Sequence, residues 1–465
     1  TSYKMDEIVD IFNKAGSLDY IGENVSQQEH SLQAAKFAQD AGADEDTILG
    51  ALFHDIGHLI GLLDKVPRQM EGDLGIVDHE RVGASFLISI GLSKKTAEIV
   101  RRHVDAKRYL CFKNPAYHKK LSPASTGTLR QQGGPMSAEE AEQFENDPLM
   151  DTIIKMRTWD EAAKVENPTF EVPPLESYRE MVERAITKER ERIIAAEYKH
   201  YKLSREQLEG WWANGFIKIS DLCSQEKKKE IIDWVDDIQN WPETAGKHMC
   251  YYEKSNSQGD LMLCRTENFI PYHDGMRSLL VEEGAVSDVL EQLLNEPGVV
   301  FKEKINYKLA GGGGFPPHQD APAFNSFGQR NHLTLNVAID RATPENGCLQ
   351  VAPGHHRVGL FPQDPVHHGL SKEEEAKLDN WMDVPLEAGD VLLFNSWLPH
   401  RSQGNTSDKS RRALYVTYNG ETDGNFRQQY YEAKRKEFPQ ACERKPGVDY
   451  SKGAETFNIA TPIVA

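Results

Sequence analysis

The sequence lacks a surplus of positive charge, and this absence limits the partners that the protein can have. Its 54 lysines and arginines are outnumbered by 72 aspartates and glutamates, which gives a formal net charge of -18 over 465 residues. Binding to a nucleic-acid backbone or to an anionic membrane surface depends on clustered positive charge. We therefore expect neither nucleic acid nor membrane as a partner, whereas a few cations inside a pocket still suffice to bind a small anion.

Cysteine pairs, long apolar runs and a leader segment are also absent from the sequence. The six cysteines are scattered without a Cys-x-x-Cys pair, as is usual for reduced thiols in the cytosol. No apolar run approaches the roughly 18 residues of a membrane-spanning helix, and no basic segment followed by an apolar one opens the chain. These absences predict a cytoplasmic location and leave the oligomeric state open.

The spacing of apolar residues changes along the chain and predicts two domains. Helical spacing dominates up to about residue 198, whereas short apolar segments bounded by Gly, Pro and Asn follow Pro297. We expect a multi-domain α and β protein, with an all-helical domain over residues 1–198 and a β-rich domain of sandwich or jelly-roll type over residues 199–465. Helices are expected at 5–12, 25–40, 46–63, 81–90, 93–104, 144–164, 175–199, 204–213 and 224–239, strands at 299–309, 332–339, 390–394 and 412–418, and a long irregular segment at 114–148.

Residues 53–58, Phe-His-Asp-Ile-Gly-His, begin a candidate metal site in the helical half. In a helix His54 and His58 share a face, with Asp55 beside them, and imidazole together with carboxylate suits a divalent metal. The pair is also open to a structural interpretation, in which His54 and Asp55 are hydrogen-bonded core residues. Other expected helices carry further candidates, and the full set has enough ligands for two metals with Asp55 as a bridge: His30, His54, Asp55, His79, His103 and Asp160.

The order His…His-Asp…His…His…Asp resembles the HD-domain superfamily. Residues 1–190 are most similar to its phosphonate-cleaving branch, which is related to myo-inositol oxygenase. The similarity is carried by Tyr-Ile-Gly-Glu at 20–23, His-Val-Asp-Ala-Lys-Arg-Tyr-Leu at 103–110, Ser-Pro-Ala-Ser-Thr at 122–126, Gln-Gly-Gly-Pro-Met at 132–136 and Arg-Thr-Trp-Asp at 157–160. The resemblance implies an all-α HD-domain bundle that holds a mixed-valent Fe(II)/Fe(III) di-iron centre and reacts with O2.

The same resemblance implies a role for each matching residue. One iron would be held by His30, His54, Asp55 and Asp160, and the other by Asp55, His79 and His103. The implied catalytic residues are Tyr20, which would cap an iron at rest, Glu23, which would bind a substrate amine, and His58. The phosphonate would be bound by His58, Lys107, Ser122 or Thr126, and Arg157. Ordinary surface charge remains an alternative for the lysine and the arginine, and the two hydroxyls depend on an unknown loop geometry.

A second group of metal-binding residues lies in the β-rich half. His318-Gln-Asp320 follows a run of four glycines, and His400 comes after an expected strand. A His-x-Asp pair with a distant histidine is typical of non-haem Fe(II) oxygenases, whose three protein ligands leave positions for substrate and O2. Arg411 suits a two-pronged bond to the distal carboxylate of 2-oxoglutarate, and Ser402 would add a hydrogen bond. The sequence alone leaves open whether Arg411 or its neighbour at 412 faces the pocket.

Residues 203–440 resemble the phytanoyl-CoA dioxygenase family. The motifs that carry this resemblance are Asn-Gly-Phe at 214–216, Lys-Ile-Asn-Tyr-Lys at 304–308, residues 345–355, and Arg-Arg-Ala-Leu-Tyr at 411–415. It implies a double-stranded β-helix with flanking helices that uses Fe(II), 2-oxoglutarate and O2. Even-numbered positions of the strand at 302–308 share a face, so Lys304 and Asn306 are candidates to face an anion, although an outward, solubilising role is equally open.

Together the two resemblances imply a bifunctional enzyme of phosphonate catabolism whose substrate is a small organophosphonate. The C-terminal domain would hydroxylate 2-aminoethylphosphonate, or an N-methylated analogue, at C1. The N-terminal domain would then cleave the C–P bond of 2-amino-1-hydroxyethylphosphonate oxidatively to glycine and phosphate. Two alternatives stay open: an HD phosphohydrolase fused to a 2-oxoglutarate oxygenase of unrelated substrate, and a chain in which one domain is a non-catalytic regulatory binding module.

Overall fold

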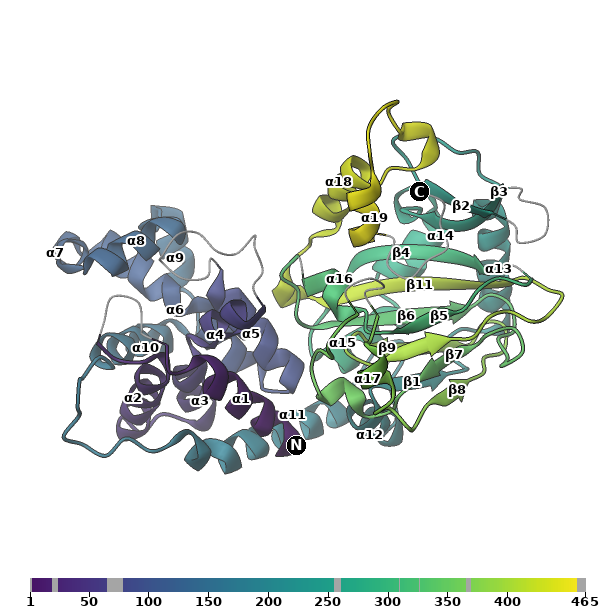
Figure 1. Ribbon diagram of the computed structural model, residues 1–465. Coiled ribbons are helices and arrows are strands. Elements are labelled where there is room, and N and C mark those ends of the chain that lie inside the picture. Colours follow the sequence, from purple (N-terminus) through teal and green to yellow (C-terminus); the bar gives the residue numbers. More distant parts are fainter. Residues whose placement is uncertain are drawn as a thin grey trace. The chain divides into compact units, whose positions relative to one another are not determined.

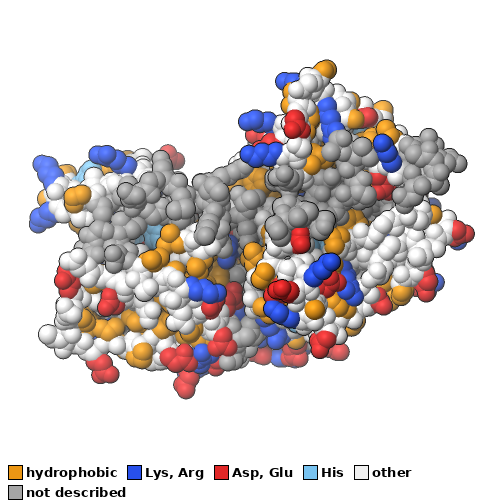
Figure 2. All heavy atoms as spheres, viewed as in Figure 1, with side chains coloured by type: hydrophobic (Ala, Val, Ile, Leu, Met, Phe, Trp, Pro, Cys, Tyr) orange, Lys and Arg blue, Asp and Glu red, His pale blue; other side chains and the backbone are white. Residues whose placement is uncertain are grey.

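The chain folds into two compact units, one helical and one built on antiparallel strands (Figure 1). The computed structural model describes residues 2–18, 24–64, 78–254, 261–308, 310–325, 327–364 and 369–457. The first unit comprises Thr1–Ala195 and Gly328–Asn331, and the second Ala196–Phe327 and His332–Ala465. The expected combination of a helical region with a jelly-roll-like region is therefore confirmed. On the face drawn in Figure 2, acidic and basic side chains are interspersed.

The helical unit packs its helices around an apolar core. Large side chains that are almost completely buried include Phe12, Phe53, Phe86 and Tyr178. Ser26 and Ser93 accept hydrogen bonds from backbone N–H groups in the first turns of the helices that they cap, as expected of serine at these positions. The helices of this unit are α1 (Ser2–Ala15), α2 (Gln27–Asp40), α3 (Glu45–Phe53), α4 (Ile56–Asp64), α5 (His79–Ile90), α6 (Lys94–Lys113), α7 (Pro115–Lys120), α8 (Pro123–Gln131), α9 (Ala138–Glu145), α10 (Met150–Ala162) and α11 (Arg179–Ala195).

The expected single helix over 46–63 was wrong, because the structure breaks it at His54 and Asp55 into α3 and α4. The two helices are bent by 43° relative to one another. Gly57 lies so close to α5 that a Cβ there would meet the carbonyl oxygen of His79 at 1.8 Å. α4 therefore packs tightly on α5 directly after the change of direction. Among the described residues no single helix is long and apolar enough to cross a membrane.

The expected irregular segment at 114–148 was also wrong, because it forms α7, α8 and α9. Each of these helices begins at a side chain that caps it, namely Asn114, Ser122 and Ser137. Proline follows the cap directly in the first two of them. Small polar residues and proline are common in loops, but in this order they also mark helix starts.

The second unit contains two antiparallel sheets. The larger has the strand order β1-β9-β6-β11-β4-β3-β2, and the smaller has the order β5-β10-β7-β8. Their strands are β1 (Phe216–Ile219), β2 (Met249–Lys254), β3 (Leu261–Glu267), β4 (Gly298–Lys308), β5 (Phe315–His318), β6 (His332–Ala338), β7 (Leu349–Val351), β8 (Met382–Val384), β9 (Val391–Asn395), β10 (His400–Ser402) and β11 (Arg411–Gly420). The helices are α12 (Arg205–Asn214), α13 (Gln225–Gln239), α14 (Asp274–Val281), α15 (Ala285–Leu294), α16 (Ala321–Asn325), α17 (Lys372–Glu375), α18 (Arg427–Glu437) and α19 (Ser451–Phe457).

Strand register determines which functional side chains of the second unit lie next to one another. In the smaller sheet His400 on β10 lies opposite His318 at the end of β5. In the larger sheet Arg411 on β11 lies opposite Lys308 on β4. The two histidines are 82 positions apart along the chain, and strand pairing makes them neighbours.

The close approach at Gly57 predicts a strong effect of substitution. Gly57→Ala should lower the free energy of unfolding of the helical unit by more than about 3 kcal/mol, because a backbone carbonyl cannot move aside as a side chain can. Urea titration followed by circular dichroism measures the change. Gly210→Ala in α12 is the matched control, since nothing lies within 4 Å of its added Cβ, and it should be neutral or stabilising by up to about 1 kcal/mol. Equal effects of the two variants would contradict the packing argument.

Candidate metal centres

Asp55 lies at the centre of the histidines in the helical unit. Its Oδ2 is 3.4 Å from His54 Nε2 and 3.7 Å from His30 Nε2. Its Oδ1 is 3.5 Å from both His79 Nε2 and His103 Nε2. Each carboxylate oxygen therefore faces its own pair of imidazoles, which is the arrangement that a carboxylate bridging two metals requires.

Asp160 completes the group on the Oδ2 side of the bridge. Its Oδ1 lies 3.2 Å from His30 Nε2 and 3.8 Å from His54 Nε2, and the two ring nitrogens are 3.0 Å apart. Two ligand atoms that bind one divalent ion at about 2.1 Å and at right angles lie about 3 Å apart. The donor set therefore fits a metal ion, and His30, His54 and Asp160 are all buried.

Backbone carbonyls hold three of these imidazoles with Nε2 toward the centre. Nδ1 of His30 donates to Ala163 O over 2.8 Å, and Nδ1 of His54 donates to Ala51 O over 2.8 Å. Nδ1 of His103 likewise donates to a carbonyl, that of Val100, over 2.7 Å. Such outer bonds fix the tautomer that leaves the Nε2 lone pair free for a metal.

The charge of Asp55 is stabilised by its surroundings. Burial by itself raises the pKa of this carboxyl, but the neighbouring His54, together with His103 and His79, lowers the pKa well below its usual value. Burial likewise raises the pKa of Asp160, and the Arg157 guanidinium outweighs it and lowers that pKa well below the usual range. Both carboxylates are therefore ionised, as metal ligands must be.

His58 lies on α4, beyond the break that follows His54 at the end of α3. The break between α3 and α4 places its ring in a stack on His79, with ring centroids 3.8 Å apart. His58 forms a second group of three close ligand atoms together with Asp55 and His79. Burial and the neighbouring His79 hold the pKa of His58 well below its usual value, so the ring is neutral.

Lys107 is a buried residue and not a surface charge. Its Nζ donates to Thr128 Oγ1 over 2.8 Å. Burial lowers its pKa to about 8, and the positive charge of Arg157 adds to this effect. Thr128 was missed at the sequence level, where Ser122 and Thr126 were the candidate hydroxyls. Because helix α8 was not expected in this segment, its spacing gave no indication of which hydroxyl meets the lysine.

Arg157 is also buried, and protein groups occupy all three of its nitrogens. NH1 donates to Asp160 Oδ2 over 2.6 Å, Nε donates to Tyr117 OH over 2.9 Å, and NH2 pairs with Glu161 Oε1 at 2.9 Å. The guanidinium therefore positions the Asp160 carboxylate, a role that the sequence did not suggest.

The remaining candidate residues of this unit lie either in α8 or outside the described part of the chain. Ser122 is the cap of α8, where its Oγ accepts a hydrogen bond from Ser125 N over 3.2 Å. Thr126 lies one turn further along α8 and is partly exposed. Tyr20 and Glu23 lie outside the described residues.

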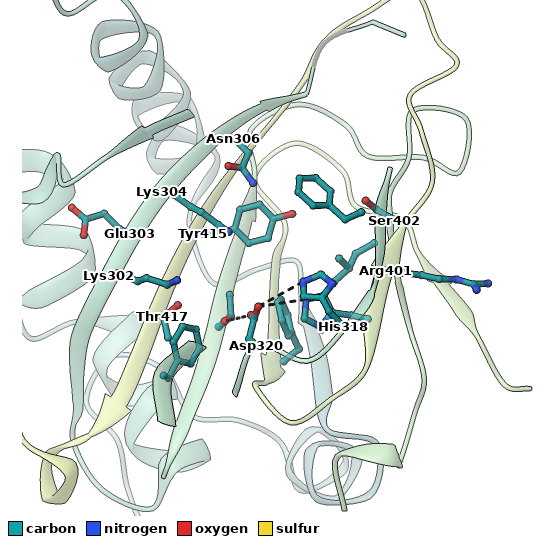
Figure 3. Close-up of a pocket in the computed structure, with 16 residues that line it drawn as sticks. Lys302, Glu303, Lys304, Asn306, His318, Asp320, Arg401, Ser402, Tyr415 and Thr417 are labelled. Atoms are coloured by element: carbon teal, nitrogen blue, oxygen red, sulfur yellow. Dashed lines mark hydrogen bonds and ion pairs between the residues drawn. The ribbon is translucent and has the colours of Figure 1, made fainter. Parts of the chain in front are cut away.

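The β unit contains a separate group of three ligands. Nε2 of His318 and Nε2 of His400 each lie 3.8 Å from Asp320 Oδ1. These residues line a cavity whose wall also contains the rings of Phe315 and Phe394. Figure 3 shows His318 and Asp320 facing this cavity. One carboxylate and two imidazoles at such distances fit a single metal ion with open positions.

Outer hydrogen bonds orient the three ligands of the β unit. Nδ1 of His318 donates to the carbonyl of Pro316 over 2.8 Å, and Nδ1 of His400 donates to that of Leu398 over 3.0 Å. Thr334 Oγ1 donates to Asp320 Oδ2 over 3.1 Å. Both Nε2 atoms and Oδ1 therefore remain available to a metal, and the role of the threonine was not foreseen.

Protonation in this group also suits metal binding. Burial, helped by the neighbouring His400, lowers the pKa of His318 to about 4. Burial raises the pKa of Asp320, but the two histidines outweigh it and bring that pKa down to about 2. At neutral pH His318 is therefore neutral and Asp320 is ionised, the states that bind Fe(II).

The two adjacent arginines on β11 have different surroundings. Arg412 pairs with Asp340 at 2.9 Å and with Asp236, on the outside of the sheet. Arg411 is buried, and among the described residues its Nε has no hydrogen-bond partner. It lines a second cavity, which shares Asn306 and Phe315 with the first. Arg411 is thus the arginine that faces inward, next to the ligand group.

Ser402, the other candidate for binding 2-oxoglutarate, lines the first cavity. Its Oγ accepts a hydrogen bond from Lys308 Nζ over 3.2 Å. Lys308 therefore joins Arg411 at this end of the site. The alternation of side chains along β4 could have identified this lysine, because position 308 lies on the same face of the strand as positions 304 and 306.

The different surroundings of the two arginines predict different effects of mutation. Arg411→Met should raise the KM for 2-oxoglutarate at least about tenfold, because a charge-assisted bond to the distal carboxylate is lost. Arg412→Met, the matched control, should leave this KM unchanged since its guanidinium is engaged with Asp340 and Asp236. Steady-state succinate formation at varied 2-oxoglutarate measures both. A larger effect of Arg412→Met would contradict the assignment.

Comparison with known proteins identifies a different family in each half of the chain. Residues 211–413 match the family Phytanoyl-CoA dioxygenase (PhyH), and residues 28–145 match the HD domain. The chain is 42% identical over 260 residues to the 2-aminoethylphosphonate dioxygenase of Uncultured bacterium HF130_AEPn_1, an alignment that covers 56% of this chain and 98% of that protein. It is 40% identical over 238 residues to the methylphosphonate hydroxylase of Gimesia maris, covering 51% of this chain and 89% of the relative.

A further relative is the (1-hydroxy-2-(trimethylamino)ethyl)phosphonate dioxygenase (glycine-betaine-forming) of Leisingera caerulea. The two are 41% identical over 178 residues, which is 38% of this chain and 88% of that protein. The protein is therefore an oxygenase whose β unit uses Fe(II) and 2-oxoglutarate. It belongs to the phytanoyl-CoA dioxygenase family through residues 211–413 and carries an HD domain at residues 28–145.

Proposed function

We propose that the chain carries out two successive oxidations of an aminoethylphosphonate in the cytoplasm. Residues 199–465 hydroxylate 2-aminoethylphosphonate, or an N-methylated analogue, at C1. Residues 1–198 then cleave the C–P bond of the resulting 2-amino-1-hydroxyethylphosphonate to glycine and phosphate. The main support is that one chain holds two complete ligand groups of different kinds, one arranged around the bridging carboxylate of Asp55 and one with a single carboxylate, Asp320. The names of the relatives support the substrate class.

In the β unit His318, Asp320 and His400 would hold the Fe(II). With 2-oxoglutarate and O2, this ion supplies the oxidant for a C–H bond, and succinate and CO2 are the co-products. Arg411 and Ser402 orient the distal carboxylate of 2-oxoglutarate from one end of the site. The aromatic wall of the cavity excludes water and keeps the C1 carbon of the substrate close to the metal position.

In the helical unit the proposed ligands divide on the two sides of Asp55. His30, His54 and Asp160 would hold one iron, and His79 and His103 the other, with Asp55 shared. The pair of irons supplies the oxidising chemistry for C–P cleavage. One O2 is consumed, its two oxygen atoms appear in glycine and phosphate, and no external reductant is needed.

We further propose that Lys107 binds the phosphonate in the helical unit. Its buried ammonium, held by Thr128, is a point charge suited to a phosphonate oxygen. Arg157 contributes mainly through Asp160, because its nitrogens are already engaged. Tyr20 and Glu23 retain their proposed roles as iron cap and amine ligand on the strength of the family resemblance. The six free cysteines support the cytoplasmic location.

The two steps should be separable by mutation. With 2-aminoethylphosphonate, Fe(II), 2-oxoglutarate and O2, the unaltered protein should release phosphate. His318→Ala should lower that release at least about 100-fold, because it removes a metal ligand, yet it should spare release from the prehydroxylated substrate. Asp55→Ala should let the hydroxylated intermediate accumulate. Phosphate assays together with ³¹P NMR measure both species.

Removal of O2 is the control that distinguishes the alternatives. Phosphoester cleavage that persists without O2 would show a phosphohydrolase in place of an oxygenase. If His318→Ala abolished release from both substrates, or Asp55→Ala from neither, the division of labour would be wrong. If one unit proved inactive with every phosphonate, that unit would be a binding module.

The lowered pKa of Lys107 predicts a pH dependence for the second step. The ammonium is charged below its pKa of about 8 and loses its charge above it. The kcat/KM for the hydroxylated substrate should therefore fall above pH 8, by up to about tenfold per pH unit. The Lys107→Arg variant stays charged over this pH range, so its kcat/KM should not show the decrease that is due to Lys107. Any decrease caused by deprotonation of the substrate's own ammonium should remain. Identical pH profiles for the two proteins would contradict the role of Lys107.

A further inference from the structure

Two lysines of β4 face the cavity that holds the ligands of the β unit. Lys302 and Lys304 occupy even positions of the strand, and both line the cavity together with His318, Asp320 and His400. Ile305 and Tyr307, at odd positions, are buried on the other side. Figure 3 shows both lysine side chains extending from β4 toward the part of the cavity that contains Asp320. The outward role that strand alternation left open is thereby excluded for Lys304.

Neither lysine has a counter-ion within the described part of the chain. Across the described residues, no carboxylate lies within ion-pairing distance of either Nζ, and no hydrogen bond is made by either ammonium. Lys302 Nζ lies 4.7 Å from the ring centroid of Phe324, and Lys304 Nζ lies 5.5 Å from that of Tyr415. These rings contribute cation–π attraction but supply no full negative charge. Two partly buried ammonium groups thus share one cavity without neutralisation.

Of the carboxylates near the two lysines, Glu267 and Glu303 are already paired with other cations, and Asp320 is one of the three proposed metal ligands. Glu267 accepts a hydrogen bond from Lys434 Nζ over 2.6 Å. Glu303 pairs with Arg427 and also accepts from Ile270 N over 3.0 Å. Leaving two like charges together in a cavity is costly unless an anion joins them. Burial, together with the positive charges of Arg265 and Lys302, lowers the pKa of Lys304 to about 7.

The two cation sets of the β unit have different chemistry. Arg411 offers a planar fork, which matches a flat carboxylate. Lys302 and Lys304 are compact point charges with rotatable donors, and two of them match a tetrahedral oxyanion that carries two negative charges. The β unit therefore offers one set of cations suited to 2-oxoglutarate and a separate set suited to a doubly charged group.

We propose that Lys302 and Lys304 bind the phosphonate group of the substrate in the β unit and make this site selective for a doubly charged oxyanion. This inference rests on the proposed function, of which it names the substrate-binding residues. In this arrangement the lysines hold the phosphonate on the β4 side, so that the adjacent C1 carbon lies toward the three metal ligands. Selectivity then follows from charge, because a sulfonate of the same shape carries one negative charge and satisfies only one lysine.

Substrate binding can be measured without turnover. The full chain, loaded with Fe(II) and 2-oxoglutarate in the absence of O2, is titrated with 2-aminoethylphosphonate while the visible absorption of the iron–2-oxoglutarate complex is followed. Lys302→Met and Lys304→Met should each weaken binding at least about tenfold, through loss of a charge-assisted hydrogen bond. The affinity for 2-oxoglutarate should stay unchanged, which also shows that the variants fold. Lys218→Met, at an exposed lysine of β1 paired with Asp390, is the matched control.

A second series tests selectivity. The unaltered protein should bind 2-aminoethylphosphonate at least about tenfold more tightly than 2-aminoethanesulfonate, and each methionine variant should lose most of this preference. Lys304→Arg, which keeps the charge, should recover part of it. The inference is overturned if the methionine variants bind the phosphonate as the unaltered protein does, or if their affinity for 2-oxoglutarate falls in parallel.

Methylphosphonate and inorganic phosphate separate this inference from the proposed function. If the protein rejects 2-aminoethylphosphonate but binds these amine-free anions in a lysine-dependent way, the lysines keep their role and the proposed substrate is wrong. If the protein hydroxylates 2-aminoethylphosphonate with the same KM in all variants, the proposed function stands and the role of the lysines is wrong. If no phosphonate or phosphate binds, both are wrong.

Discussion

The structure depends on placing carboxylates where water cannot reach them and surrounding each with groups that stabilise its charge. Asp55 is the clearest case, because its two oxygens face separate pairs of imidazoles. An isolated buried carboxylate would be costly and would be expected to bind a proton. Here the imidazoles keep it ionised, and carbonyl bonds to their Nδ1 atoms hold the rings in the orientation that does so. The break between α3 and α4 allows neighbouring residues His54 and Asp55 to serve this one centre.

In the β unit fewer groups stabilise the charge of the carboxylate at the centre of the site. Asp320 is held by Thr334 on one oxygen and faces His318 and His400 with the other. Around it, most buried charges are paired, as Lys434 is with Glu267. Lys302 and Lys304 depart from this pattern. Because buried cations without a carboxylate partner are costly unless a ligand supplies the opposite charge, the ligand chemistry follows from what the described part of the fold leaves incomplete.

The two units also treat anions differently. In the helical unit Arg157 is engaged with Asp160, Tyr117 and Glu161, so its charge serves the metal ligand. In the β unit Arg411 keeps its Nε without a protein partner in the described part of the chain. The same residue type is a positioning group in one site and a candidate ligand-binding group in the other. Only the surrounding hydrogen bonds distinguish the two roles.

Much of this could be predicted from local patterns in the sequence. Caps at Ser26 and Ser93, the two fold types and the shared face of the even-numbered positions on β4 depend on short-range spacing, which a sequence displays directly. The grouping of the histidines and aspartates followed from residue type together with family resemblance. The tertiary structure alone decided features that depend on distant neighbours: the close packing of Gly57 on α5, and the pairing of Arg412 with Asp340 that leaves Arg411 facing inward. It also showed that Thr128 is the hydroxyl that meets Lys107, and that Lys302 and Lys304 lack a counter-ion among the described residues. Residue type and spacing determine which chemistry is available, whereas contacts between segments far apart in the chain determine which side chains are left free to perform it.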